Sequence, residues 1–345
     1  MHMADALLSP AVGGTLYAVS GAAAALAAAK IKNGELGEKK LPLMAVSGAF
    51  VFAAQMINFA IPGTGSSGHI GGGILLAGLL GGYPALLTLA AVLTIQCLFF
   101  ADGGLLALGA NIFNMGVVPC LIVYPLLFRP LLKKGITPGR LSAASILSAI
   151  AGLGLGAFGV VAETMASGVA ELPFAAFAGL MLPIHLVIGA VEGVITAAVL
   201  TYVCKTRPEL LQSALDRAPV RAGVSVKKTV AALAVCAVLA GGGLSFYASQ
   251  NPDGLEWAMG RILQGRELRA DDAAHTAAAA VQQHTAILPD YDTAKGGGGA
   301  TGAAGVTGAL LTCALAGGAG AAVTLTKKRA KKRRDDESRQ NPGRE

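Results

Sequence analysis

The chain has 345 residues, of which 54% are hydrophobic and only 14% are charged. A soluble globular domain carries about 25% charged residues, so this composition excludes an ordinary soluble protein and predicts a polytopic membrane protein. The net charge of +7 does not indicate nucleic acid binding, because the basic residues lie in short segments between apolar runs and in the tail 327–334. That distribution is typical of cytoplasmic loops, and the alternative for the tail is contact with anionic membrane lipid.

The chain opens with Met1-His2, and a free terminal amine followed by histidine is a chelator. The Met1 amine and the His2 amide nitrogen can close one chelate ring on a metal, and the same amide and the His2 Nδ1 can close a second. Another imidazole would complete a square-planar set of nitrogens, which suits Ni(II) or Cu(II) and not Zn(II). We expect no cleavable signal peptide, because the first residues lack a basic region and Asp5 precedes the first apolar run. We also expect Met1 to be retained, because an initiator methionine is usually removed only before a small residue and histidine is not small. The alternative is that histidine at position two is chance.

Apolar segments follow in a regular series, and most have the length of about 20 residues that a membrane span needs. The segment 70–101 is either one long helix or two helices broken at Gly81-Gly82-Tyr83-Pro84. The segments are 11–29, 43–61, 70–101, 105–128, 141–165, 174–204, 227–248 and 301–326.

Charge placement favours two helices in the segment 70–101. Basic connectors lie at 30–40, 129–140 and 205–228, with the tail from 327. Two crossings put all of them on the cytoplasmic side, as the positive-inside rule requires, and predict nine spans. The N-terminus, the His69 loop and residues 249–300 then lie outside, and the C-terminus is cytoplasmic. The helix 70–81 is too short to face lipid, so we expect it inside the bundle.

The loop Pro62–His69 carries a histidine among glycine, serine and threonine. The predicted topology puts His69 on the same side of the membrane as His2, so it is the candidate for the fourth nitrogen. Ser67 and its neighbours could orient the ring. The alternative is a solvated loop histidine.

Several polar side chains interrupt the apolar spans, namely Asn58, Gln96, Asn111 and Asn114. Such residues face the interior of a helix bundle, where they either hydrogen-bond across helices or line a path for an ion. The sequence leaves both interpretations open.

His185 and Glu192 lie seven residues apart and therefore on one face of the span 174–204. An ionisable pair inside a membrane is a candidate for transport chemistry, and the competing interpretation is a structural pair between helices. His275 and His284 lie in the outer segment, where we expect them to be solvated.

Signatures of catalysis are missing from the sequence. It contains no GxxxxGK[ST] phosphate loop, no HExxH zinc motif and no nucleophile elbow. We therefore expect a protein that does not hydrolyse ATP itself and is not a membrane enzyme. No cofactor is expected.

The combined motifs resemble the CbiM/NikM substrate-binding permeases of energy-coupling factor (ECF) transporters for nickel and cobalt. The matching stretches are Met1–Asp5 with Ser9-Pro10, the loop Pro62–His69 with Gly71-Gly72, the run 102–115, and His185–Gly193. The part with Asn251–Glu256 between two spans resembles the family's small CbiN/NikN subunit. The sequence therefore divides into a permease at 1–204, a cytoplasmic linker at 205–226 and a two-span unit at 227–345.

This resemblance implies an all-α membrane fold, with a seven-helix bundle like that of ECF substrate-binding components plus the two-span unit. It implies metal held by the Met1 amine, the His2 amide and imidazole, and His69. It also implies two partners, a transmembrane coupling component and cytoplasmic ATPases. The predicted function is import of nickel or cobalt across a bacterial inner membrane, with nickel slightly favoured. The alternative is an ATP-independent transporter or channel for divalent transition metals.

Overall fold

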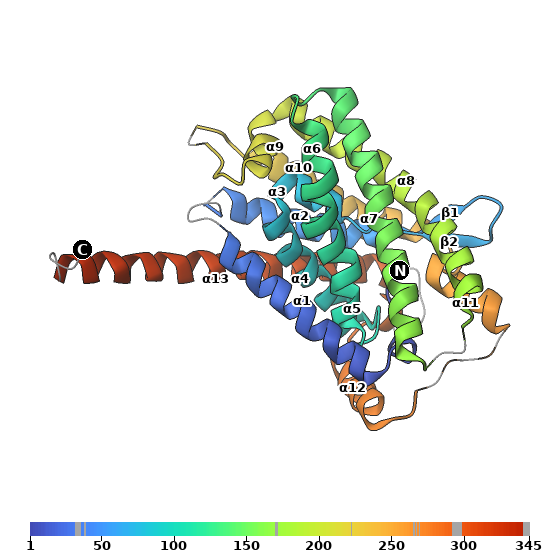
Figure 1. The fold of residues 1–345 in the computed structure, drawn as a ribbon. Helices are drawn as coiled ribbons and strands as arrows, with labels where there is room; N and C mark the ends of the chain where they lie inside the picture. Colours follow the sequence, from blue (N-terminus) through green and yellow to red (C-terminus); the bar gives the residue numbers. More distant parts are fainter. Residues whose placement is uncertain are drawn as a thin grey trace.

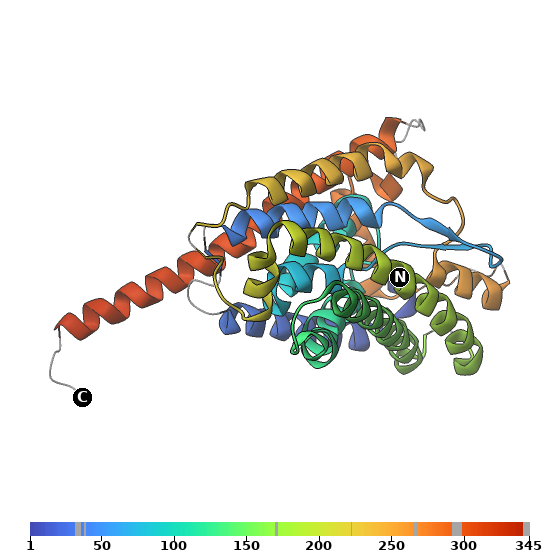
Figure 2. The same ribbon diagram turned by 90° about the horizontal axis from the view of Figure 1, so that it is seen from above.

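The computed structural model describes residues 1–31, 36–37, 39–169, 172–221, 223–264, 266, 268, 270–291 and 299–340. These residues form a helical bundle with a single two-stranded hairpin, and the C-terminal helix α13 projects beyond the other helices (Figures 1 and 2). The predicted all-α membrane fold is confirmed.

The order of the elements follows the apolar segments of the sequence. They are η1(Asp5–Leu7), α1(Pro10–Lys30), α2(Lys40–Gln55), β1(Phe59–Ile61), β2(Ser66–Gly68), α3(Gly73–Leu80), α4(Gly82–Phe100), α5(Leu108–Ile112), η2(Phe113–Phe128), α6(Arg129–Leu132), α7(Pro138–Ser167), α8(Phe174–Thr206), α9(Pro208–Leu215), α10(Lys227–Gly242), η3(Leu244–Tyr247), α11(Gly254–Leu263), α12(Ala273–Thr285), η4(Pro289–Tyr291) and α13(Gly299–Gln340). The stretch η2 is π-helical and contains Pro119 and Pro125, each of which removes a backbone donor from the helix.

Within the described residues, six helical stretches are long and apolar enough to cross a membrane. They are α1, α4, the continuous stretch Leu108–Leu132, α7, α8 and the part Thr301–Arg333 of α13. The protein is therefore a multi-pass membrane protein. Helices α2 and α10, with 16 residues each, are shorter, so the predicted total of nine crossings stays a prediction.

The segment 70–101 is broken into α3 and α4, as the sequence predicted. Gly81 forms the break with φ 90° and ψ 155°, a conformation that a residue with a side chain rarely adopts. A Cβ on Gly82 would lie 2.4 Å from the Cys120 carbonyl oxygen, so the neighbouring η2 approaches closely. All eight residues of α3 are buried. The polar backbone groups at the ends of this short helix therefore lie inside protein and are not exposed to lipid.

The predicted apolar segment 43–61 is not helical to its end. Helix α2 stops at Gln55, and the chain continues into the antiparallel hairpin of β1 and β2. Pro62, which lacks a backbone N–H, precedes a turn in which Gly63 and Gly65 have φ of 78° and 75°. His69 follows directly after strand β2 of this hairpin, at the entrance to the helical bundle.

The last two long helices, α10 and α13, pack against α2 and against each other. Their closest approach is at Gly241 and Gly305, where a Cβ on Gly305 would lie 2.2 Å from the Gly241 carbonyl oxygen. Small residues at such a contact allow two membrane helices to meet at the backbone.

Replacing Gly305 by Ala is expected to push α10 and α13 apart and to destabilise the protein by about 1–3 kcal/mol. The matched control is Gly318→Ala in the same helix, where an added Cβ meets nothing within 4 Å. Both substitutions improve helix propensity equally, so their difference isolates the packing. Thermal unfolding in detergent measures it, and equal melting temperatures for the two variants would contradict the prediction.

Candidate metal site

The N-terminal residues are held inside the bundle by backbone contacts. The Met3 N–H donates to Asn111 Oδ1 at 2.8 Å, and Asn111 Nδ2 donates back to the Met3 carbonyl at 3.3 Å. The Gly104 N–H also donates to that carbonyl, at 2.8 Å. Met1 and Met3 are buried. Asn111 therefore fixes the terminal segment.

His69 presents one free nitrogen to the N-terminus. Its Nδ1 lies 3.0 Å from the Ile70 carbonyl oxygen, which only accepts hydrogen bonds, so Nδ1 carries the proton and Nε2 keeps its lone pair. The Met1 nitrogen lies 3.4 Å from Nε2. The structure thus brings together two of the predicted ligands in the tautomer that metal binding requires.

A relay of two glutamines reaches the imidazole of His2. Gln55 Nε2 donates to the Gly71 carbonyl and Gln96 Nε2 donates to Gln55 Oε1, each at 2.8 Å. Gln96 Oε1 is left as an acceptor 3.2 Å from His2 Nε2. This relay supplies an acceptor for a proton on Nε2. A second acceptor, Asp102, lies at Nδ1, the nitrogen that the proposed chelate needs, so the relay alone does not fix the tautomer.

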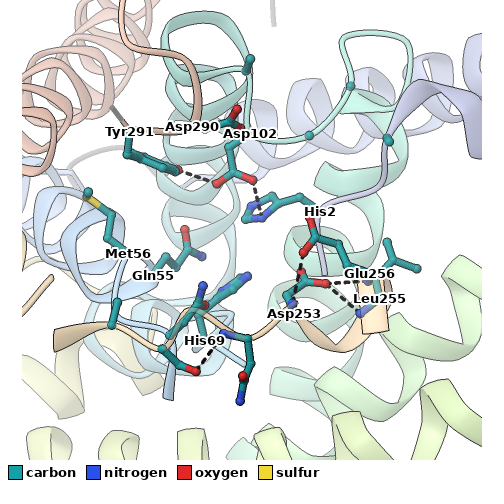
Figure 3. A pocket seen from close by; sticks show the side chains of 18 of the residues that line it. His2, Gln55, Met56, His69, Asp102, Asp253, Leu255, Glu256, Asp290 and Tyr291 are labelled. Atoms are coloured by element: carbon teal, nitrogen blue, oxygen red, sulfur yellow. Dashed lines mark hydrogen bonds and ion pairs between the residues drawn. The ribbon is translucent and has the colours of Figure 1, made fainter. Parts of the chain in front are cut away.

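The two imidazoles stack face to face, with ring centroids 5.1 Å apart and an angle of 18° between the planes. His2 Nδ1 lies 3.1 Å from Asp102 Oδ1, and the second oxygen of Asp102 accepts the Tyr291 hydroxyl (Figure 3). A carboxylate oxygen only accepts hydrogen bonds, so in this contact His2 Nδ1 carries the proton, at the nitrogen that the predicted chelate would use.

A residue that the site prediction did not include, Asp253, forms an ion pair with the N-terminal amine. Its Oδ2 lies 2.6 Å from the Met1 nitrogen, and its Oδ1 caps α11 through the N–H groups of Leu255 and Glu256. The signal was present in the stretch Asn251–Glu256, but sequence patterns could not show that it reaches Met1 across 252 positions.

Ser67 does not orient His69, contrary to the expectation. Its N–H donates to the Pro252 carbonyl at 2.8 Å and its hydroxyl to the Asn251 carbonyl at 2.8 Å. The neighbouring strand end is held in the same way, because the Ser249 N–H donates to the Asn58 carbonyl. Ser67 and Asn58 therefore hold residues 249–252 against the hairpin, close to His69.

The remaining predicted residues lie deeper in the bundle and do not contact the Met1 amine or the imidazoles of His2 and His69. Asn114 Nδ2 donates to Glu163 Oε2 at 2.7 Å. Glu192 accepts the N–H groups of Gly71 at 2.7 Å and Gly72 at 3.0 Å. His185 and Glu192 therefore do not pair with each other; Glu192 instead holds the backbone just after His69.

His275 is buried, so the expectation of a solvated histidine was wrong. Its Nε2 lies 3.0 Å from the carbonyl oxygens of both Asp5 and Leu8, and its Nδ1 lies 2.7 Å from Asp272 Oδ2. All these partners accept hydrogen bonds, and contacts to both nitrogens raise the pKa of His275 despite its burial. The outer segment thus also holds the start of α1, as the position of α12 beside it shows (Figure 1).

Burial and charge together keep the candidate ligands neutral. Burial is the main reason that the pKa of His69 falls to about 3, and the positive N-terminus adds to the effect. Burial also lowers the pKa of His2, although Asp102 acts in the opposite direction. Burial acts to raise the pKa of Asp253, but the Met1 ammonium, the backbone hydrogen bond from Glu256 and the electrostatic interaction with His69 together lower it. Burial therefore favours the neutral form of both imidazoles. His69 offers Nε2 without losing a proton, whereas His2 Nδ1 faces the acceptor Asp102.

An open cavity of about 910 Å³ leads to these residues. We call it the outer vestibule after the side of the membrane on which the charge distribution of the sequence predicts it to lie. Its lining includes His2, His69 and five carboxylic residues, Asp5, Asp102, Asp253, Glu256 and Asp290 (Figure 3). Among the residues that the structure describes, no Lys or Arg lines it. In a chain of net charge +7, this surface is selectively attractive to cations.

Side chains alone do not make the site. In the described part of the chain, no group of three or more His, Cys, Asp or Glu side chains could hold a metal ion. The predicted ligand set depends on the terminal amine and the His2 amide, which only the position of Met1-His2 supplies. The structure places the Met1 amine beside His69, with Asp253 and Asp102 next to them, and the metal-binding role of this set stays a prediction.

Two family profiles match this chain. Residues 2–210 match CbiM, the cobalt uptake substrate-specific transmembrane region, and residues 227–325 match the PDGLE domain. The resemblance that the sequence motifs indicated is thereby confirmed.

Individual relatives agree with these profiles. The chain is 40% identical to a Haloquadratum walsbyi protein provisionally named a metal transport protein, over 61% of this chain and 93% of that one. It is 34% identical to the fused nickel transport protein NikMN of Rhodobacter capsulatus, over 64% of this chain and 65% of that one. A crystal structure of a truncated transition metal transporter superposes with a TM-score of 0.53 at 29% identity, over 60% of this chain and 99% of that one.

The CbiM profile spans well over half of the sequence and contains His2 and His69, while the PDGLE profile contains Asp253. The chain belongs to the CbiM family, with a PDGLE domain fused behind its transmembrane region.

Proposed function

We propose that this protein is the substrate-specific membrane component of an ECF-type importer for Ni(II) or Co(II). The observation that carries the proposal is the convergence of the Met1 amine, His2 and His69, with the lone pair of His69 Nε2 aimed at the amine 3.4 Å away. Relatives named as nickel and cobalt transport proteins support the same class of cargo.

The proposed ligands are four nitrogens: the Met1 amine, the His2 amide, His2 Nδ1 and His69 Nε2. A planar set of this kind favours nickel over metals that prefer a tetrahedron. Binding requires that the amine leave Asp253 and that His2 Nδ1 leave Asp102, so both carboxylates compete with the cargo for its ligands. They also remain beside the site as negative charges that offset the charge of the incoming ion.

The proposed orientation places the N-terminus and the outer vestibule outside a bacterial inner membrane and the basic end of α13 in the cytoplasm, where it can contact anionic lipid. ATP hydrolysis would come from cytoplasmic ATPases through a transmembrane coupling component, because the sequence lacks a phosphate loop. Import that continues without these partners would instead support an ATP-independent transporter.

Calorimetric titration of the purified chain with Ni(II), Co(II) and Zn(II) tests the proposal directly. We expect one site per chain, tightest for Ni(II), and a visible spectrum of planar nitrogen coordination. Intact-mass analysis of the same sample verifies that Met1 carries a free amine. Equal affinity for Zn(II), or no binding of either Ni(II) or Co(II), would count against the function.

The charge of the outer vestibule is expected to accelerate metal capture. Glu256→Gln combined with Asp290→Asn should lower the association rate several-fold at low ionic strength, and salt should remove the difference. Gln still serves the N-terminal cap of α11, so the fold is preserved. The matched control is Asp271→Asn, which changes an exposed carboxylate outside the vestibule. Stopped-flow measurement of metal binding decides; a rate that does not depend on salt would refute the effect.

A further inference from the structure

His185 on α8 has a buried nitrogen that the structure leaves without a partner. Its Nδ1 lies 2.8 Å from the Met181 carbonyl oxygen, an acceptor, so Nδ1 carries the proton and Nε2 keeps its lone pair. The side chain is 1% exposed, and Nε2 has no hydrogen-bond partner among the described residues. Burying an acceptor in this way destabilises a protein and calls for an explanation.

The imidazole borders a small cavity next to the proposed metal site. The cavity measures about 10 Å³, which approaches the space of a single water molecule. Met1, His69 and Asp253 line it together with His185. A Cβ on Gly254 would lie 3.0 Å from His185 Cε1, so glycine at this position gives the imidazole its room.

Shared residues place this cavity behind the metal site as seen from the outer vestibule. His69 and Asp253 line both the vestibule and the cavity, whereas His185 lines only the cavity. A further cavity shares Gly71, Met115 and Leu153 with it and adds Asn114 and Glu192. A path that followed these cavities in the order of their shared residues would reach His185 before Glu192.

We propose that His185 Nε2 is the first ligand that the metal ion binds after it leaves the Met1, His2 and His69 site. This inference rests on the proposed function. Because the described His, Cys, Asp and Glu side chains form no group of three that could hold a metal, His185 holds the ion with a single side chain and water. Such weak binding suits a position of passage, since an ion on a transport path must also be able to leave.

Uptake and binding measurements on His185→Ala and His185→Gln separate passage from capture. In the assembled importer we expect uptake of Ni(II) to fall about tenfold or more, while the dissociation constant of the purified chain changes by about threefold or less, because only the step after capture loses a ligand. The control is His284→Gln, which removes an exposed histidine of the outer segment. Uptake at the native rate in both His185 variants would overturn the inference.

A spectroscopic measurement reads the position itself and does not depend on transport. In His185→Cys, with the capture site blocked by a residue added ahead of Met1, Co(II) bound at the cavity should produce thiolate-to-metal charge-transfer absorption. His284→Cys with the same extension should not, although both variants keep the native cysteines. Absence of the band in His185→Cys at millimolar Co(II) would overturn the inference.

The two proposals fail in different ways. If the native chain binds neither Ni(II) nor Co(II), the proposed function is wrong. If the native chain binds and imports metal, and the His185 variants do the same at the native rate, only the role of His185 is wrong.

Discussion

A chain with one extra residue ahead of Met1 should bind Ni(II) about 100-fold more weakly or worse. The extension removes metal ligands, and loss of a single residue that only hydrogen-bonds to a ligand already costs about 10–100-fold in affinity. The extension converts the amine into an amide and moves His2 out of the second position, so both chelate rings are lost. It also removes the positive charge that pairs with Asp253 at 2.6 Å. Calorimetry on the extended chain and the native chain measures the effect.

A cleavable extension provides the control for this experiment. Protease treatment that restores Met1 as the first residue should restore binding, while an equal extension at the C-terminus should have no effect. His69→Gln should weaken binding in the native chain but change little in the extended one, because its partners are already absent. Undiminished binding by the extended chain would show that the amine is not a ligand.

The affinity should also rise with pH. Metal binding must remove a proton from the Met1 amine and from the His2 amide, whereas the pKa of His69, lowered to about 3 by burial, leaves that ring neutral. Protons therefore compete with the metal at the N-terminus and not at His69, and affinity falls as pH falls. Titrations in two buffers of different ionisation enthalpy count the released protons; release of none would contradict the chelate.

Glu192→Gln is expected to have the second-largest effect. The carboxylate accepts the N–H groups of Gly71 and Gly72 with its two oxygens. An amide has one such oxygen, so one buried N–H would face an NH2 group, at a cost of about 1–3 kcal/mol. The loop that carries His69 should loosen, lowering both the melting temperature and the affinity for Ni(II).

Glu163→Gln is the matched control for this substitution. Glu163 is also a buried carboxylate, but its described side-chain partner is the amide of Asn114, which bonds one oxygen. The carbonyl of a glutamine can accept that bond unchanged. Thermal unfolding and calorimetry on both variants decide the matter; equal melting temperatures would show that the two bonds from Glu192 do not stabilise the His69 loop.

Local patterns predicted much of this molecule. The apolar runs predicted the long helices, and the Gly81-Gly82 pair with Tyr83-Pro84 predicted the break between α3 and α4. Met1-His2 and His69 could be related because charge placement put them on one side of the membrane. These signals are local or additive, so a single sequence contains them.

The contacts that complete the site are of another kind. The relay from Gly71 through Gln55 and Gln96 to His2 joins helices α2 and α4 to two segments outside helices and strands. No periodicity of the sequence relates its members. Asp253 meets Met1 because a loop of the PDGLE domain docks on Ser67. His275 reads as a polar residue in a polar segment, yet it is buried by α1. Docking between distant segments depends on shape, which composition does not reveal.

The ion pair between Met1 and Asp253 joins the CbiM part of the chain to the PDGLE part. In a single polypeptide, the two groups meet at an effective concentration that a separate subunit could reach only by tight association. If the proposed metal site is correct, a weak contact is therefore enough to hold Asp253 against the Met1 amine until a metal ion binds, and the ion can still displace it. Covalent fusion would then keep this contact present at all times without making it hard to displace.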